Sequence, residues 1–292
     1  ANMELRTLGR TGERLSAVGF GGIVVDKMEH REAERWVDEA LAAGINYFDV
    51  APSYGDAETR LGPALYGKRD EVFLACKTTE RTRDGASREL EQSLENLRTD
   101  RFDLYQAHAM STLDDVETFF GPNGAGETFL RAREEGKTRY LGFSAHTEEA
   151  ALAMMERFDF DTILFPTNYV NWLTGGFGPR VLERARSADM GILALKAMAR
   201  QKWPEGTDKS RYSKCWYEPE DDERFAHLAL RFAWTQGVTA CVPPGAPELW
   251  RMAVRLANQG TEPLSDAEMD ELRERAVGKT PIFAAIGGAT LR

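Results

Sequence analysis

The 292-residue chain is 42% hydrophobic and 29% charged, an ordinary composition for a globular protein with a large buried core. Its net charge of -10 is spread in mixed runs, and no apolar run approaches the roughly 20 residues of a membrane span, so nucleic acid and membranes are not expected partners. Three separated cysteines without CxxC spacing fit a reducing, cytoplasmic setting, and four scattered histidines predict no metal site.

The chain opens with residues 4–19, which predict a β-hairpin, and then alternates short apolar strands with amphipathic helices at a period of about 30 residues. The predicted strands are 17–22, 45–50, 71–77, 102–108, 139–144, 161–166, 191–196 and 239–244. The predicted helices are 31–44, 59–67, 87–98, 126–136, 148–158, 179–189, 222–237 and 247–259, with a further helix at 264–276.

Eight strands, each followed by a helix, are typical of the (β/α)8 TIM barrel. We therefore expect an α/β protein with a single barrel domain over residues 1–292, an N-terminal β-hairpin cap and an extra C-terminal helix. An open doubly wound sheet is the alternative. That fold normally begins with a GxGxxG turn, which the segment GFGGIVV does not supply.

Two stretches interrupt the alternation of strands and helices. Residues 110–126 lengthen the fourth connection between strand and helix, and residues 197–221 lengthen the seventh. The second stretch contains two Trp, two Tyr and several Lys and Arg residues. Long loops on the C-terminal face of a barrel usually cover a ligand. A disordered surface segment is the alternative for this polar stretch.

Ionisable residues end three consecutive predicted strands, namely Asp49, Lys77 and His108, and Tyr54 follows the first of them. Neighbouring parallel strands lie about 4.8 Å apart, so their C-terminal ends would bring these side chains to one mouth of the barrel. Each residue alone has an ordinary explanation, as a loop cap, a rim aromatic, a solvated charge or a core histidine. Together at the strand ends, they indicate an active site.

These four residue types fit the reversible conversion of a carbonyl group to an alcohol. Free Tyr and Lys both titrate near 10, but a lysine ammonium close to a phenol lowers the tyrosine pKa, and a carboxylate keeps that lysine charged. Such a tyrosine can give a proton to a carbonyl oxygen while hydride reaches the carbon. A neutral histidine can donate a second hydrogen bond to the same oxygen. Hydrolysis is less favoured, because no GxSxG motif is present.

The segments FDVAPSYGDAETRLGPAL, VFLACKT, SLENLRTDRFDLYQAH and EEGKTRYLGFS resemble the aldo-keto reductase superfamily, and the similarity continues through essentially the whole chain. The Asp-x4-Tyr-Gly motif, the Lys, the His and the Gly-x-Ser occur in family order. The resemblance implies a (β/α)8 barrel that uses NADPH or NADH without a metal. It also implies Tyr54 as the general acid/base, Lys77 and Asp49 as its tuning pair, and His108 as the residue that orients the carbonyl.

The nicotinamide end of the implied cofactor site departs from the family pattern. Ser144 matches the family's carboxamide-binding Ser, but the Asn expected next is Ala145. Asn168 lies near the position of the family's Gln on the sixth strand. On the seventh strand, the aromatic residue that commonly stacks on nicotinamide is replaced by Leu195, which Lys196 follows.

The phosphate end is expected after the Pro-Gly turn at Gly245, where Arg251 and Arg255 begin a helix whose N-terminus suits a phosphate. A solvated helix face is the alternative for both arginines. The predicted cofactor contacts are Gly21, Gly22, Asp49, Ser144, Asn168, Lys196, Gly245 and Arg251. NADP(H) is the expected cofactor, with NAD(H) as the alternative.

The predicted substrate contacts are Val24, Tyr54, His108, Trp172 and Trp203, which would line an apolar pocket for a small carbonyl compound or alcohol. Core or rim packing explains Val24 and each tryptophan equally well. The expected function is an NADP(H)-dependent oxidoreductase. The alternatives are a cofactor-binding sensor or interaction subunit with little turnover, and a metal-free lyase or isomerase on the same scaffold. The sequence carries no signal for the oligomeric state.

Overall fold

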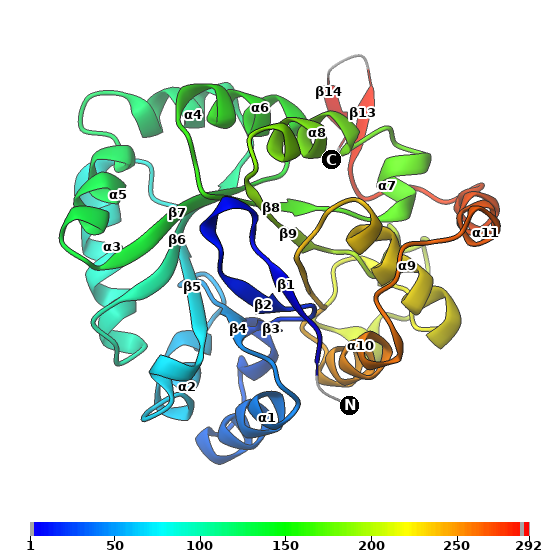
Figure 1. Cartoon of the computed structure of the whole chain (residues 1–292), viewed down its shortest axis with the longest axis horizontal. Coiled ribbons are helices and arrows are strands. Elements are labelled where there is room, and N and C mark those ends of the chain that lie inside the picture. The colour runs from blue at the N-terminus through cyan, green and yellow to red at the C-terminus, as the bar shows by residue number, and fades with distance from the viewer. Residues whose placement is uncertain (1–2, 287–288, 292) are drawn as a thin grey trace.

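In the computed structural model, which describes residues 3–286 and 289–291, parallel strands surround a common axis and helices surround the strands (Figure 1). The eight-stranded sheet consists of β3 (Phe20–Gly21), β4 (Tyr47–Asp49), β5 (Phe73–Thr78), β6 (Phe102–Met110), β7 (Thr138–Ala145), β8 (Thr162–Pro166), β9 (Gly191–Leu195) and β12 (Ala240–Val242). The Cys241 amide donates to the Ala17 carbonyl (2.9 Å), and the Gly19 amide donates to the Cys241 carbonyl (2.9 Å). These bonds join the segment just before β3 to the last strand, β12, so the predicted barrel is confirmed and an open sheet is excluded.

The outer layer is built from amphipathic helices that return the chain from one strand to the next. They are α1 (His30–Ala42), α2 (Ala57–Ala64), α3 (Arg83–Asn96), α5 (Ala125–Glu134), α6 (Glu148–Arg157), α8 (Pro179–Ser187), α9 (Glu223–Thr235) and α10 (Pro247–Gln259). In α1, for example, Ala33, Val37 and Ala40 form the buried face at helical spacing. No helix in the described part of the chain is long and apolar enough to cross a membrane.

The extra C-terminal helix is also confirmed, as α11 (Asp266–Ala276). It begins with a capping box, in which the Ser265 hydroxyl accepts from the Glu268 amide and the Glu268 carboxylate accepts from the Ser265 amide. A short antiparallel hairpin, β13 (Ala284–Ile286) and β14 (Ala289–Leu291), follows it. The sequence had not predicted this hairpin.

Side chains alternate between the barrel interior and the helix layer along each strand. Phe73 and Ala75 of β5 pack in the interior with Leu104 of β6. Cys76 points the other way, and its thiol donates to Oε2 of Glu58 on α2 at 3.6 Å. Lys77, which follows Cys76, therefore shares the interior face with Ala75.

The N-terminal hairpin, β1 (Leu5–Thr7) and β2 (Arg14–Ser16), lies across the centre of the barrel in Figure 1. Leu8 and Leu15 are buried in the same apolar cluster as the interior side chains of the strands. The hairpin therefore closes the end of the barrel opposite the C-terminal ends of the strands, as predicted.

The segment 110–126, which lengthens the fourth connection as expected, contains a helix that was not predicted, α4 (Leu113–Phe120). The Thr112 hydroxyl accepts a hydrogen bond from the Asp115 amide and caps the helix, and Val116 and Phe119 are buried one turn apart. With only two buried positions over eight residues, the pattern was too short to indicate a helix. A second short helix, α7 (Tyr169–Leu173), was missed for the same reason.

The segment 197–221 folds back onto the barrel. It contains a small antiparallel ladder, β10 (Ala199–Gln201) with β11 (Glu218–Pro219), and a 3-10 turn at Ser210–Tyr212. The Lys214 ammonium donates to the backbone carbonyls of Ile23 (3.2 Å), Val24 (2.9 Å) and Asp26 (3.2 Å). The segment is therefore tied to the turn that follows β3, and the interpretation as a disordered excursion is wrong.

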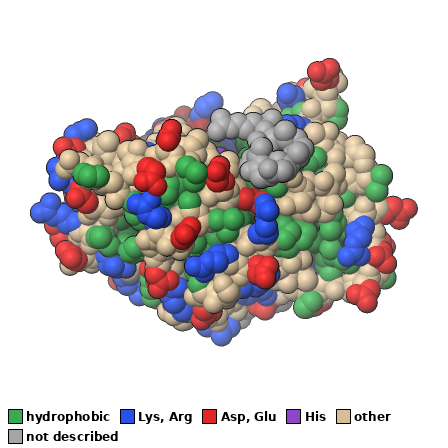
Figure 2. Space-filling view, turned by 90° about the horizontal axis from the view of Figure 1, so that it is seen from above, with side chains coloured by type: hydrophobic (Ala, Val, Ile, Leu, Met, Phe, Trp, Pro, Cys, Tyr) green, Lys and Arg blue, Asp and Glu red, His purple; other side chains and the backbone are tan. Residues whose placement is uncertain are grey.

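The acidic side chains that give the chain its net negative charge are interspersed with many basic side chains. Figure 2 shows one side of the molecule, where Lys and Arg side chains lie among Asp and Glu side chains. Ion pairs such as Arg157 with Glu117 (2.7 Å) and Arg224 with Glu271 (2.6 Å) join elements of the outer layer. On this side the acidic composition therefore does not form a field of one sign.

Candidate active site

The C-terminal ends of β4, β5 and β6 bring Asp49, Lys77 and His108 to one mouth of the barrel, and Tyr54 lies in the turn between β4 and α2. The strand register pairs Asp49 with Ala75, and therefore places Lys77 one interior position above Asp49. Asp49 and Lys77 are fully buried, whereas Tyr54 and His108 are partly exposed. The structure thus assembles the four residues that were predicted to be catalytic.

Lys77 is held by Asp49 through a buried ion pair, with 2.6 Å between Nζ and Oδ2. Burial lowers the pKa of Lys77, but the charge of Asp49 and its hydrogen bond raise that pKa further, to above its ordinary value. The lysine is therefore an ammonium at neutral pH. Its Nζ lies 5.0 Å from the centroid of the Tyr54 ring.

The pKa of Tyr54 is raised above its ordinary value. Burial is the largest cause, and the charge of Lys77 opposes it by favouring the phenolate. From the sequence we expected Lys77 to lower the tyrosine pKa; that effect is present, but burial outweighs it. The phenol of Tyr54 consequently carries its proton at neutral pH.

The turn that carries Tyr54 depends on the glycine of the Asp-x4-Tyr-Gly motif. Gly55 has a φ of +59°, and a Cβ on it would lie 2.3 Å from Oδ1 of Asp26. The same Asp26 oxygen accepts the Asp56 amide at 3.1 Å. Glycine adopts this backbone conformation without strain and leaves room for the Asp26 side chain between the turn after β4 and the turn after β3.

His108 lies edge-on to Tyr54, with 6.0 Å between ring centroids and 88° between ring planes. Burial, followed by the charge of Lys77, lowers the pKa of His108 to about 2. The imidazole is therefore neutral at physiological pH and carries one N–H donor. Its Nδ1 atom is buried and has no partner in the described part of the chain.

The backbone around His108 is held from two sides. Arg81 Nη2 donates to the His108 carbonyl oxygen at 2.6 Å, and the Ala109 amide donates to Ser144 Oγ at 2.8 Å. Ala109 has a φ of +60°, and the β6–β7 register shifts between Ala107 and Met110. This irregularity at the end of β6 sets the direction in which His108 projects.

Three of the predicted cofactor contacts, Ser144, Asn168 and Lys196, lie at or just beyond the C-terminal ends of β7, β8 and β9. The Ser144 hydroxyl accepts from Ala109 and keeps its own proton for donation. Asn168 caps α7 through Oδ1, which accepts the Asn171 amide at 2.8 Å. Its Nδ2 is buried without a partner among the described residues.

Lys196 is a second lysine close to the four-residue cluster. Burial, followed by the charge of Lys77, lowers its pKa to about 8. Its Nζ lies 5.8 Å from the Trp216 ring centroid, and its φ is +60°. The described residues include no carboxylate within ion-pair distance of this ammonium.

The predicted glycine contacts lie at the seam where the first and last strands of the barrel meet. A Cβ on Gly21 would lie 3.0 Å from Val242, one on Gly22 would lie 2.7 Å from Val50, and one on Gly245 would lie 2.7 Å from Ile23. Close packing of the seam therefore already requires small residues there. The structure supplies a packing reason for all three glycines.

Arg251 lies on α10, beside a cavity of about 370 Å3 at the N-terminus of that helix. Its guanidinium binds Glu39 through two hydrogen bonds of 3.0 and 2.9 Å and lies 4.5 Å from the Trp36 ring centroid. The cavity is lined by Trp36, Arg211, Tyr212, Ser213, Lys214, Ala246, Pro247, Glu248 and Arg251. Arg251 thus forms part of the wall with its charge already paired, and Arg255 is paired with Glu223.

The aromatic and apolar residues predicted to contact substrate are engaged elsewhere in packing. Val24 is fully buried in the outer core. Trp172 packs edge-on against Phe232 of α9, with 5.6 Å between ring centroids. Trp203 donates from Nε1 to the Cys215 carbonyl at 3.0 Å, within its own loop. These contacts account for all three residues without a substrate.

A different aromatic group borders the mouth. Phe283 stacks on His146, with centroids 5.4 Å apart and 26° between ring planes, and meets Trp216 edge-on at 6.0 Å. The charge of His146 contributes to the lowered pKa of His108, so the two histidines are close. We call Trp216, Phe283 and His146 the aromatic wall.

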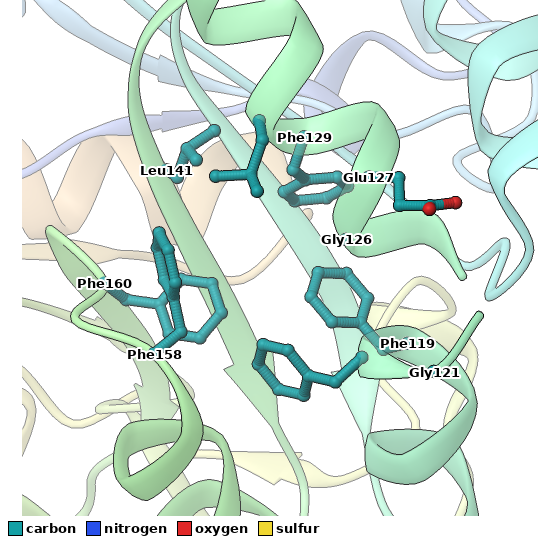
Figure 3. A pocket seen from close by; sticks show the side chains of 10 residues that line it. Phe119, Gly121, Gly126, Glu127, Phe129, Leu141, Phe158 and Phe160 are labelled. Atoms are coloured by element: carbon teal, nitrogen blue, oxygen red, sulfur yellow. The ribbon is translucent and has the colours of Figure 1, made fainter. Parts of the chain in front are cut away.

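A separate apolar cavity of about 140 Å3 lies in the outer layer, between β7 and helices α4 and α5 (Figure 3). Its lining consists of Phe119, Phe120, Gly121, Gly126, Glu127, Phe129, Leu130, Leu141, Phe158 and Phe160. None of the four clustered residues borders this cavity. This cavity is therefore separate from the candidate active site.

Two residues of the candidate site, Gln106 and Phe283, were not predicted from the sequence. Gln106 precedes His108 by two positions, so strand alternation alone places it on the interior face, yet it was given no role. Phe283 carried no local signal, because its position depends on how the C-terminal segment crosses the barrel.

Comparison with known proteins places this chain in a known family. Residues 17–214 match the model of the Aldo/keto reductase family. L-galactose dehydrogenase of Arabidopsis thaliana is 30% identical over 219 residues, which cover 68% of this chain and 66% of that protein. Aldo-keto reductase YhdN of Bacillus subtilis is 32% identical over 161 residues, 49% of this chain and 47% of that protein. The chain thus spans about half to two thirds of the length of these curated relatives.

Solved structures show the same fold. The holo form of an aldo-keto reductase from Bacillus halodurans superposes with a TM-score of 0.74 at 23% identity, covering 96% of this chain and 99% of that one. An aldo-keto reductase from Klebsiella pneumoniae, solved in complex with NADPH, gives a TM-score of 0.69 at 19% identity over 94% of this chain and 95% of that one. The match of the family model over most of the barrel shows that this chain belongs to the aldo/keto reductase family.

Proposed function

We propose that the chain is an oxidoreductase that interconverts an aldehyde or ketone and the corresponding alcohol with NADP(H), and that Tyr54 is its general acid/base. The observation that carries the proposal is the buried Asp49–Lys77 pair beside the Tyr54 phenol. A buried cation fixed next to a protonated phenol serves little purpose in packing. It does favour the loss of a proton from that phenol.

In the reducing direction, the Tyr54 hydroxyl donates its proton to the carbonyl oxygen of the substrate. The phenolate that remains is stabilised by the Lys77 ammonium, which was positioned before the reaction began. Asp49 keeps Lys77 charged and in place. In the oxidising direction, the same phenolate accepts the alcohol proton.

His108 is suited to orient the substrate. Because its imidazole is neutral, it donates one hydrogen bond without competing with Tyr54 to transfer a proton. Its ring centroid lies 6.0 Å from that of Tyr54, which is close enough for both residues to donate to one substrate oxygen. Such a pair of donors holds a carbonyl and stabilises the charge that develops on its oxygen.

The residues at the mouth fit a nicotinamide cofactor, which would supply or accept the hydride. The orphaned Nδ2 of Asn168 and the free proton of the Ser144 hydroxyl are donors suited to a carboxamide oxygen. The cavity at the N-terminus of α10 has Arg211, Lys214 and Arg251 in its lining, but Arg251 is paired with Glu39 and Lys214 is bound to backbone carbonyls. The helix terminus suits a phosphate group of either nucleotide, and our preference for NADP(H) over NAD(H) rests on the structural neighbours. The K. pneumoniae neighbour was itself solved with NADPH.

Nucleotide binding and turnover test the proposal separately. The chain has six Trp residues, so titration with NADPH and with NADH can be followed by fluorescence. Turnover is then measured on a panel of aldehydes and ketones. We expect Tyr54→Phe to lower kcat by at least about 100-fold, with the Kd for NADPH changed by less than about twofold. Tyr66→Phe is a matched control, because Tyr66 is 76% exposed.

The outcomes separate the alternatives. Failure to bind either nucleotide would contradict the proposal. Binding without turnover on any carbonyl, unaffected by Tyr54→Phe, would favour a sensor or interaction subunit. Full activity in Tyr54→Phe would show that another group transfers the proton.

A further inference from the structure

Gln106 of β6 is a fully buried amide in the barrel interior, directly beside the proposed acid–base machinery. The strand register pairs it with Lys77. Its Nε2 donates to Oδ1 of Asp49 at 3.1 Å and to the Cys76 carbonyl at 3.3 Å. With the amide reversed, its oxygen would face the anionic Asp49 oxygen, so electrostatics favours the orientation with nitrogen toward Asp49.

Asp49 is therefore held through both carboxylate oxygens. Lys77 occupies Oδ2 at 2.6 Å, and Gln106 occupies Oδ1. Two hydrogen bonds on opposite oxygens prevent the carboxylate from rotating away from the lysine, and both stabilise its negative charge. The position of the Lys77 ammonium thus depends on the amide of Gln106.

The oxygen atom of the same Gln106 amide indicates why a glutamine stands at this position. Its Oε1 atom is buried and has no hydrogen-bond partner in the described part of the chain. A buried acceptor without a partner costs free energy, which an apolar residue of the same size would avoid. Packing alone therefore does not explain a glutamine at this position, whereas donation to Asp49 does.

We propose that Gln106 is a positioning residue, which acts through Asp49 to hold the Lys77 ammonium where it stabilises the Tyr54 phenolate. This inference rests on the acid–base role proposed above for Tyr54. Gln106 itself touches Asp49 and the Cys76 carbonyl, not the reacting atoms.

The first test is Gln106→Met, which removes the donor at nearly constant volume. Loss of a hydrogen bond to a charged group is expected to lower kcat on the order of 10- to 100-fold, with little change in the KM for NADPH. Because the ammonium is then less well held, the pKa of Tyr54 should rise further. Ultraviolet difference titration of the phenolate, with Tyr54→Phe as the reference and no cofactor present, measures that rise directly.

Gln106→Glu gives a signature that a purely structural role does not predict. When the new carboxyl group is protonated, its O–H can donate to Oδ1 of Asp49 as the amide did. When it is ionised, the donor is lost and two carboxylates repel each other. The activity of this variant relative to the native protein should be highest at low pH and should fall as pH rises. Gln106→Met should show no such recovery.

Thr162→Val is the matched control. Thr162 is fully buried on β8, and its hydroxyl likewise has no partner among the described residues. Its loss should leave kcat and the pH profile unchanged, with folding of all variants checked by thermal melting.

Native kcat and a native phenolate titration in Gln106→Met, while Tyr54→Phe is inactive, would overturn the positioning role alone. Equal losses in both Gln106 variants at every pH would also overturn it, by showing a general packing defect. If Tyr54→Phe is fully active, the proposed function fails instead. If Gln106→Met does not fold, the recovery of Gln106→Glu at low pH decides the question.

Discussion

The Nζ atom of Lys77 lies 2.6 Å from Oδ2 of Asp49, and neither side chain is exposed to solvent. A buried ion pair contributes little net stability as a pair, but removing one partner leaves a buried charge without its counter-ion. The arrangement therefore ties the stability of the barrel mouth to the residue that is proposed to tune Tyr54.

Lys77→Met should remove most activity and also destabilise the fold. The Tyr54 phenolate loses its neighbouring cation, so kcat should fall by at least about 100-fold. Asp49 remains buried without its partner, which should lower the free energy of unfolding by about 3–5 kcal/mol. Enzyme assays and urea denaturation measure the two effects. Nucleotide affinity should remain nearly native; a large loss of it would contradict the proposed role of Lys77.

A surface lysine provides the control for Lys77→Met. Lys68 pairs with Asp38 on the outside of the barrel, where both side chains are partly exposed. Exposed ion pairs contribute about 0–1 kcal/mol, so Lys68→Met should change neither activity nor stability appreciably.

His108 should make the protein less stable as the pH falls. Its pKa is about 2 in the folded chain, against about 6.5 in an unfolded one, so between these values the unfolded chain binds a proton that the folded chain does not. The stability that depends on neutral His108 is fully present above about pH 6.5 and is lost below it, at about 1.4 kcal/mol per pH unit. Urea denaturation at several pH values between 7 and 5 measures the slope. His108→Asn should have a shallower slope, and identical slopes would contradict this assignment.

Lys214→Met should weaken cofactor binding by releasing the segment 197–221. The native ammonium donates to the backbone carbonyls of Ile23, Val24 and Asp26, and so joins this segment to the turn after β3. Without these bonds, the segment that lines the cavity at α10 would be less ordered, and ordering it would cost part of the free energy of cofactor binding. We expect the Kd for NADPH to rise about tenfold, mainly through faster dissociation in stopped-flow fluorescence. Lys209→Met, in the exposed part of the same segment, should leave both values native.

The sequence identified the barrel and the four-residue cluster because both follow from short-range patterns. Each strand is a compact apolar run, and Asp49, Lys77 and His108 stand at the ends of three such runs. The order of parallel strands then determines which side chains meet. Strand alternation also predicts that Gln106, two residues before His108, shares the interior face of β6 with it.

The substrate side of the site could not be predicted in this way. Val24 and Trp172 were candidates because large apolar residues often line pockets, but the same property lets them pack in the core, and the structure places them there. Trp216 and Phe283 meet only because the segment 197–221 and the C-terminal segment cross the same mouth. The course of each segment depends on tertiary contacts, so no local sequence pattern predicts it.

Trp216→Ala should raise the KM for aromatic carbonyl substrates and leave kcat close to native. Trp216 is 56% exposed, meets Phe283 edge-on, and lies over the Lys196 ammonium, so it can cover a ring that enters the mouth. Aromatic contacts of this kind contribute about 0.5–1.5 kcal/mol, which corresponds to a KM roughly 2- to 12-fold higher. Small aliphatic aldehydes should be affected much less, because they do not reach the aromatic wall. Tyr66→Ala, which removes an exposed aromatic ring outside the site, serves as the control. Equal KM increases for aromatic and aliphatic substrates would show that Trp216 holds the loop in place and does not contact the substrate.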